Sequence, residues 1–199
     1  MSVAILITGS NSGRREDNIT RARALIIERV GDAVASSRVM ESEPWGEVAP
    51  EGAARGKADN FLNQVVAVET ALGPERLLDA LQRIEKELGR DRGVREEGKN
   101  PERDVQEECE NREKATRGEC RNAAERAARR YLSRSIDIDI LFYDRMVLDT
   151  PRLTIPHPLL GQREFVLRPL MEAMPRFRHP VSGKTARELL AELENKGND

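Results

Sequence analysis

Two aspartates in one short apolar segment are the residues of this sequence best suited to chemistry. In Ile136-Asp137-Ile138-Asp139-Ile140 the residue types alternate, and successive side chains of a β-strand point to opposite faces. The carboxylates start about 7 Å apart, from a rise of about 3.3 Å per residue, so their oxygens can converge on one or two hard cations. The alternative is an edge strand with one solvated face, where acidic residues are harmless.

Basic side chains flank this acidic segment in the sequence. Arg134 precedes it, and His157 and Arg163 follow it. Arginine and histidine beside a carboxylate pair are suited to a polyphosphate, because its oxygens carry charge that a metal alone does not neutralise. His157 lies between Pro156 and Pro158, which restrict its backbone. A lone histidine is more often a packing or surface residue, but this context favours a metal-dependent phosphoryl-transfer site.

A glycine-containing turn near the N-terminus is a weaker candidate. Gly9-Ser10-Asn11-Ser12-Gly13 follows an apolar run and precedes a helical pattern, as a phosphate-binding loop does. It has neither the Gly-Lys-Ser/Thr ending nor the Gly-x-Gly-x-x-Gly spacing of nucleotide-binding loops. We interpret it as a tight turn between a strand and a helix.

The elements that must position these residues follow a simple order. Apolar runs and helical spacing predict, in turn, a strand at 3–8, a helix at 19–30, a β-compatible segment at 34–41, a strand at 62–70, a helix at 74–88 and a strand at 136–143. Gly31 and Gly89 are placed to end the two helices. This order is the split βαβ arrangement of ferredoxin-like folds, so we expect an α+β fold with an antiparallel sheet covered by two helices.

The rest of the chain adds a C-terminal extension and a charged insertion. The extension is predicted as a strand pair at 146–148 and 153–155, a helix at 165–174 and a last helix that begins at Thr185 with a capping box. The stretch from about 93 to 130, before the acidic strand, is rich in Glu, Arg and Lys, and we expect a solvated helix, a flap or a disordered insertion. We expect one domain over residues 1–199.

Composition excludes several classes of function. A net charge of −2 argues against broad binding of nucleic acid or of an anionic membrane surface. Cys109 and Cys120 are too few for a disulfide framework or a four-ligand zinc site, so we expect free thiols in a reducing compartment. The first apolar run is too short for a secretory signal or a membrane span. We therefore expect a soluble cytoplasmic protein. Since no segment of the sequence marks an oligomer interface, we expect a monomer.

The motifs together resemble the 6-hydroxymethyl-7,8-dihydropterin pyrophosphokinase family of folate biosynthesis. The matching segments, in order over nearly the whole chain outside the insertion, are Gly9-Ser10-Asn11, Ser42-Glu43-Pro44-Trp45-Gly46, Asn60-Phe61-Leu62-Asn63, Gln82-Arg83-Ile84-Glu85, Gly89-Arg90, the run from Arg134 to Leu141, Ile155-Pro156-His157-Pro158, the run from Arg163 to Leu167, and Pro169-Leu170. The resemblance implies transfer of diphosphate from ATP to the pterin hydroxymethyl group, with release of AMP.

The resemblance also implies roles for individual residues. Asp137 and Asp139 would bind two Mg²⁺ ions, and the catalytic set would be Arg134, Asp137, Asp139, His157 and Arg163. The residues around ATP would be Gln82, Arg92, Arg134, Ile140, Arg152, Thr154, His157 and Arg163. For the pterin, Phe61 and Phe165 would stack on the two ring faces, Asn63 would hydrogen-bond the ring edge, and Ser42, Pro44 and Trp45 would complete the pocket.

The sequence departs from the family pattern in two places. Tyr131-Leu132-Ser133-Arg134 stands where the family often has Arg-Trp-Gly-Pro-Arg on a loop that closes over ATP. Arg126, Arg129 and Arg130 are alternative phosphate contacts from the insertion. The loop at 47–59 is longer than usual, and Met40 and Ser42 replace residues that are often Tyr and Thr.

Two other functions stay open at this point. One is a non-catalytic ligand-binding module on the same scaffold, since a fold does not determine a function. The other is an enzyme of the same type whose acceptor is a different hydroxymethyl heterocycle.

Overall fold

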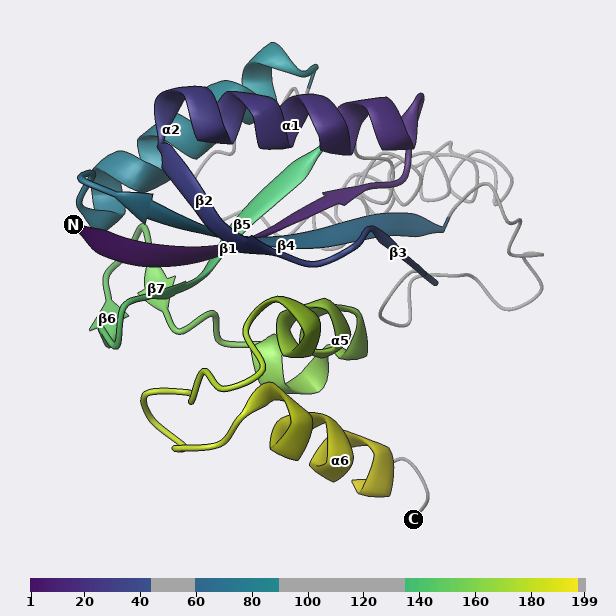
Figure 1. Cartoon of the computed structure of the whole chain (residues 1–199), viewed down its shortest axis with the longest axis vertical. Helices are drawn as coiled ribbons and strands as arrows, with labels where there is room; N and C mark the ends of the chain where they lie inside the picture. The colour runs from purple at the N-terminus through teal and green to yellow at the C-terminus, as the bar shows by residue number, and fades with distance from the viewer. Residues whose placement is uncertain (44–59, 90–134, 197–199) are drawn as a thin grey trace, which may run out of the picture.

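A computed structural model describes residues 1–43, 60–89 and 135–196 (Figure 1). Several predictions fall outside these ranges: the roles of Pro44, Trp45, Arg92 and Arg134, the insertion at 93–130 with both cysteines and its three arginines, and the loop at 47–59.

The described chain is built on one five-stranded antiparallel sheet. Its first elements are β1 (Ser2–Ser10), α1 (Arg15–Arg29), β2 (Gly31–Ser36), β3 (Met40–Ser42), β4 (Phe61–Thr70), α2 (Pro74–Glu87) and β5 (Asp137–Tyr143). The strand order is β2-β4-β1-β5, and β3 also pairs with β4. Every pairing is antiparallel, so the predicted antiparallel sheet in a mixed α and β fold is confirmed.

The C-terminal extension lies against this sheet. It consists of β6 (Leu148–Asp149), β7 (Thr154–Ile155), the short 3₁₀ helix η2 (Leu160–Gln162), α5 (Glu164–Ala173) and α6 (Ala186–Lys196). β6 and β7 form the predicted small hairpin. The predicted capping box is also present, because Thr185 N–H donates to Glu188 Oε2 at 2.6 Å and Glu188 N–H donates to Thr185 Oγ1 at 3.3 Å.

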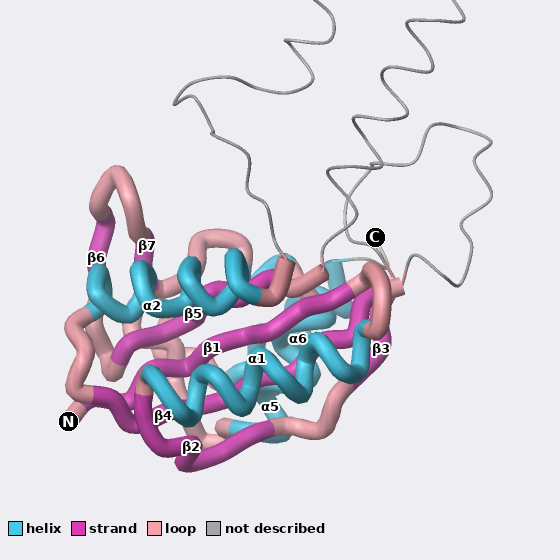
Figure 2. Tube along the Cα trace, turned by 90° about the horizontal axis from the view of Figure 1, so that it is seen from above, coloured by secondary structure: helices cyan, strands magenta, loops and turns pink. Residues whose placement is uncertain are grey.

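Helices cover both faces of the sheet (Figures 1 and 2). On one face α1 and α2 pack on a core that includes Leu77, Leu81 and Ile84 of the predicted helical stripe. On the other face α5 packs on β4, and α6 packs on α5. The sequence pattern predicts two covering helices, and the C-terminal extension adds a second helical layer on the other face. Within the described ranges, none of the helices combines the length and apolar character needed to span a bilayer.

The two glycines predicted to end helices do so for different reasons. Gly89 follows Leu88, the C-cap residue of α2, with φ of +88°, a conformation that glycine adopts without a steric penalty. Gly31 begins β2 beside β4, and a Cβ at this position would lie 2.0 Å from the carbonyl oxygen of Glu69. The close packing of two strands therefore requires glycine at this position.

His179 lies in the turn before α6 and gives one testable dependence of stability on pH. Its Nδ1 accepts the N–H groups of Val181 (3.2 Å) and Ser182 (3.3 Å), and its ring meets Phe142 edge-on at 5.5 Å between centroids. Burial lowers the pKa of His179, so the unfolded chain binds a proton more readily than the folded one. Stability from this residue is then complete above the unfolded pKa of about 6.5 and is lost as pH falls below it.

We therefore expect the free energy of unfolding to decrease less between about pH 7 and pH 5 in His179→Asn than in the unsubstituted protein. Denaturant titrations of both proteins at a series of pH values measure this. His157 is unchanged in both proteins, so its contribution cancels in the comparison. Equal pH slopes in the two proteins would contradict the prediction.

Candidate active site

The acidic strand presents its two aspartates as the alternating pattern predicted. Ile136, Ile138 and Ile140 lie in the core beneath α1 and α2, and Asp137 and Asp139 are half-buried. Because alternate residues face opposite sides of a strand, both carboxylates project from the other face of the sheet. This is the face on which α5 packs against β4. The pairing of β1 with β5 shifts register between Ile5 and Leu6 of β1. The regular alternation of β5 therefore ends just beyond the two aspartates.

Strand register places the acidic pair beside the predicted pterin residues. Gly9 of β1 lies opposite Asn63 of β4 on one side and opposite Asp137 of β5 on the other. The three residues therefore form one row on one face of the sheet, and Asn63 and Asp137 are about 10 Å apart at two strand spacings. Gly9 contributes no side chain between them. This row joins the predicted metal site to the predicted pterin site.

His157 and Arg163 approach this row from the C-terminal extension. The N–H of His157 donates to the carbonyl of Leu141 on β5 at 3.0 Å, which fixes the histidine to the acidic strand. Burial lowers the pKa of His157, the positive charge of Arg163 lowers it further, and the carboxylate of Asp137 opposes both effects. The three charged or titratable groups are thus within electrostatic reach of one another, as the sequence analysis expected.

The hydrogen bonding of His157 also sets its tautomer. Its Nδ1 accepts the N–H of Leu159 at 3.3 Å, and a neutral imidazole has one acceptor and one donor nitrogen. With the pKa lowered, the ring is neutral at pH 7 and its Nε2 carries the proton. The side chain can then donate one hydrogen bond to an anionic oxygen.

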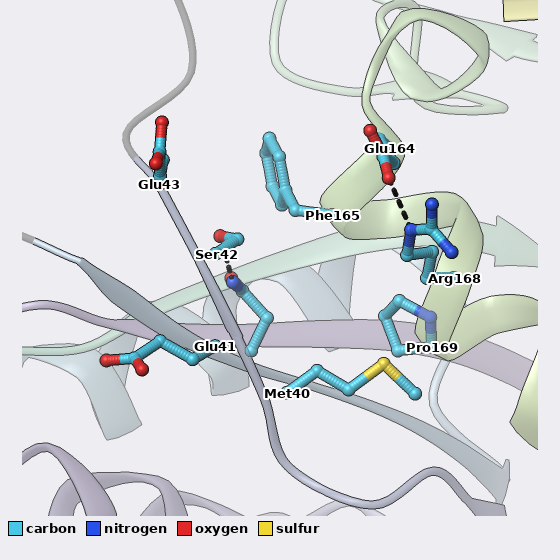
Figure 3. Close-up of a pocket in the computed structure, with 9 residues that line it drawn as sticks. Met40, Glu41, Ser42, Glu43, Glu164, Phe165, Arg168 and Pro169 are labelled. Atoms are coloured by element: carbon cyan, nitrogen blue, oxygen red, sulfur yellow. Dashed lines mark hydrogen bonds and ion pairs between the residues drawn. The ribbon is translucent and has the colours of Figure 1, made fainter. Parts of the chain in front are cut away.

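A cavity of about 370 Å³ lies between β3 and α5, next to Asn63. Ser42, Asn63 and Phe165, three of the residues predicted to bind the pterin, line it (Figure 3). The side-chain amide of Asn63 donates to Ser42 Oγ at 2.9 Å and is 3% exposed. Arg163 lies beside this cavity, since its Cζ is 5.7 Å from the ring centroid of Phe165. Phe61 is not among the cavity-lining residues, although its ring carbon Cδ1 would lie 3.9 Å from a Cβ at position 9.

Sequence reasoning missed the remaining lining residues of this cavity, which are Met40, Glu41, Glu43, Glu164, Arg168 and Pro169. The sequence did contain a signal for Arg168 and Pro169. Phe165, Arg168 and Pro169 lie three to four residues apart along α5, so they share one helical face. Arg168 on that face is held by an ion pair with Glu164.

Besides His157 and Arg163, the described residues predicted around the nucleotide lie on α2, the small hairpin and β5. Arg152 forms ion pairs with Asp79 (2.6 Å) and Glu75 (3.3 Å) of α2, which hold the hairpin against that helix. Thr154 donates its hydroxyl to Asp149 at 3.0 Å, and Gln82 is half-buried on α2. The side chain of Ile140 is 4% exposed in the core on the opposite face from the aspartates, so only its backbone is available to a nucleotide.

The acidic pair offers oxygen ligands suited to a magnesium ion whose remaining coordination positions are filled by a substrate and water. Within residues 1–43, 60–89 and 135–196, no cluster of three or more His, Cys, Asp or Glu side chains is arranged to hold a metal ion. Mg²⁺ commonly binds through one or two carboxylates, with phosphate oxygens and water filling its other positions. Asp137 and Asp139, half-buried on one face, fit that requirement.

An α+β fold in which an acidic pair, a histidine and an arginine lie near one another is suited to phosphoryl transfer. The family model for 7,8-dihydro-6-hydroxymethylpterin-pyrophosphokinase matches residues 5–105 and 99–175. The chain belongs to this family.

The chain is similar in sequence to curated relatives over most of their length. The chain is 33% identical over 181 residues to a 2-amino-4-hydroxy-6-hydroxymethyldihydropteridine pyrophosphokinase of Porphyromonas gingivalis, covering 90% of this chain and 95% of the relative. It is 32% identical over 197 residues to the enzyme of that name from Aquifex aeolicus, covering 96% and 92%.

Solved structures share the fold. A crystal structure of wild-type Plasmodium falciparum HPPK-DHPS with pteroate aligns with a TM-score of 0.59 at 15% identity. The alignment covers all of this chain and 44% of the longer one, so the present chain corresponds to less than half of that protein.

Proposed function

We propose that Asp137 and Asp139 hold two Mg²⁺ ions against the phosphates of ATP, next to a pterin bound at Asn63 and Phe165. The reaction is the family's transfer of diphosphate from ATP to the hydroxymethyl group of 6-hydroxymethyl-7,8-dihydropterin in folate biosynthesis, with release of AMP. The observation that carries the proposed site is the row in which Gly9 alone separates Asn63 from Asp137.

The phosphates meet positive charge and hydrogen-bond donors from the C-terminal extension. His157 donates from Nε2, and Arg163 supplies a guanidinium that can bind two phosphate oxygens; we propose the same role for Arg134. Gln82, Arg92, Arg152, Thr154 and the backbone of Ile140 are the proposed contacts to the rest of the nucleotide. When bound, magnesium supplies neutralisation of the charge on the phosphate oxygens.

The pterin is oriented by stacking and by hydrogen bonds to its edge. Phe165 lies on the cavity, and we propose that Phe61 and Phe165 enclose the ring, with Asn63 hydrogen-bonding its edge and Ser42, Pro44 and Trp45 closing the pocket. The hydroxymethyl oxygen then attacks the β-phosphorus of ATP and loses its proton to solvent. The bond from that phosphorus to the α,β-bridging oxygen breaks, and AMP leaves with this oxygen. Positioning and charge neutralisation provide the catalysis.

The proposal also covers the fold, the domain organisation, the location and the partners of the protein. The strand order β2-β4-β1-β5 supports a ferredoxin-like core, and we propose a single pyrophosphokinase domain over residues 1–199, with the charged insertion at about 93–130. We further propose a cytoplasmic monomer whose partners are the two small substrates, without nucleic acid or membrane.

Nucleotide analysis tests the proposal directly. Mixing the protein with MgATP and the pterin is expected to give AMP in proportion to pterin diphosphate, with no AMP when the pterin is left out. EDTA is expected to stop the reaction and added Mg²⁺ to restore it. ADP in place of AMP would overturn diphosphate transfer, and full activity in EDTA would overturn the metal role. AMP formed equally well with another hydroxymethyl heterocycle would overturn the acceptor.

A further inference from the structure

Glu85 on α2 is a fully buried carboxylate that the proposed reaction does not use. Its exposed fraction is 0%, and its neighbours along the helix include the core residues Leu81 and Ile84. Burying a carboxylate in such surroundings is costly unless hydrogen bonds compensate it. Its position in the fold therefore calls for a specific partner.

One partner is the backbone of the acidic strand. Glu85 Oε1 accepts the N–H of Ile138 at 2.8 Å, and Ile138 is the residue between Asp137 and Asp139. In the described part of the sheet, β5 is an edge strand, and N–H groups on its outer side have no strand to bind. Since antiparallel pairs alternate in their hydrogen bonding, the neighbouring positions on β5 face β1 while Ile138 N–H faces α2.

The strand is also anchored just before the acidic pair. The carbonyl of Ser135 accepts Ser10 Oγ–H at 2.6 Å and Asn18 Nδ2–H at 2.9 Å. These bonds join the start of β5 to β1 and α1. The Glu85 bond differs from them, because it acts on the peptide between the two aspartates.

We propose that Glu85 is a positioning residue that fixes the spacing and orientation of Asp137 and Asp139 through the Ile138 peptide. This inference rests on the proposed metal role of the two aspartates. Glu85 does not act as a further metal ligand: α2 packs on the face of Ile138, and both aspartates project from the opposite face. Groups that orient metal ligands typically change metal affinity or activity by about 10–100-fold when they are replaced.

Two substitutions of Glu85 separate the effect of side-chain length from the effect of charge. Glu85→Gln keeps an oxygen at the same distance from the helix and removes the charge, whereas Glu85→Asp keeps the charge and withdraws the oxygen by one methylene. We expect Glu85→Asp to raise the Mg²⁺ concentration for half-maximal turnover about tenfold, with little change in the KM for the pterin. We expect Glu85→Gln to stay within about threefold of the unsubstituted protein. Glu87→Asp is the matched control, since Glu87 lies on the same helix and pairs with Arg29 at the surface.

Amide hydrogen exchange provides a readout that does not depend on turnover. In the metal-free protein, Glu85→Asp is expected to lower protection of the Ile138 amide while the amide of Asp139, which faces β1, keeps its protection. Glu85→Gln is expected to retain protection at both positions.

The outcomes distinguish this inference from the proposed function. A larger Mg²⁺ shift in Glu85→Gln than in Glu85→Asp would overturn positioning by reach. Lost protection at Ile138 with an unchanged Mg²⁺ dependence would also overturn it, since the hydrogen bond would then serve stability alone. If Asp137→Asn itself leaves the Mg²⁺ dependence unchanged, the metal site of the proposed function fails instead.

Discussion

Replacing Asp137 with asparagine is expected to lower the turnover number for AMP formation by about 10³-fold, equivalent to about 4 kcal/mol of activation free energy. The substitution keeps the shape of the side chain and removes the charge that would hold a cation. Losing one electrostatic contact in a preorganised site typically costs about 10²–10³-fold, and loss of a metal ligand also weakens the neutralisation of the phosphates. Asp139→Asn is expected to have a comparable effect.

The structure predicts that this loss occurs without unfolding. Asp137 is half-buried at the end of an edge strand, and the core beneath β5 is made by isoleucines that the substitution leaves in place. Thermal unfolding of Asp137→Asn is therefore expected near that of the unsubstituted protein. Asp32→Asn, which changes an exposed aspartate on β2, is the matched control and is expected to keep full turnover. Turnover of Asp137→Asn within tenfold of the control would contradict the metal assignment.

Local patterns in the sequence were sufficient to predict most of the elements. The Ile/Asp alternation predicted the two faces of β5, and the spacing of Leu77, Leu81 and Ile84 predicted the buried face of α2; both are confirmed. The predicted connection between a strand and a helix is present, but Gly9 and Ser10 belong to β1 and the turn begins only at Asn11. These features depend on residues within one or two turns of each other, where periodicity and capping chemistry are decisive.

The arrangement of the site depends on information that local patterns do not contain. Gly9, Asn63 and Asp137 share a row only because of the register of three strands that are distant in the sequence, and a one-residue slip would reverse every side chain. The sequence pattern gave no signal for the burial of Glu85, which follows from the contact of α2 with β5. The covering of the second face by α5 likewise follows from tertiary packing.

Gly9 is the position at which this register gives a second large effect. A Cβ there would lie 3.1 Å from Asn63 Oδ1 and 3.9 Å from a ring carbon of Phe61, and apart from its chain neighbours no other described residue would have an atom within 4 Å. We expect Gly9→Ala to displace the Asn63 amide by a few tenths of an ångström and to raise the KM for the pterin about tenfold, or about 1.4 kcal/mol. The larger side chain in Gly9→Val is expected to lower kcat/KM for the pterin by about 100-fold or more.

The decisive measurement is whether Gly9→Ala raises the KM for the pterin without changing the KM for MgATP. Because Asn63 and Phe61 are the only described residues beyond the chain neighbours that the added carbon would contact, the KM for MgATP in Gly9→Ala is expected to stay close to that of the unsubstituted protein. Replacing a glycine inside a strand generally does not reduce the intrinsic preference for extended structure, so a folding defect is not expected from the backbone. Gly161→Ala, at an exposed glycine with open space around it, is the matched control. A normal pterin KM in Gly9→Val would show that the row through Asn63, Gly9 and Asp137 does not form the pterin-facing side of the site.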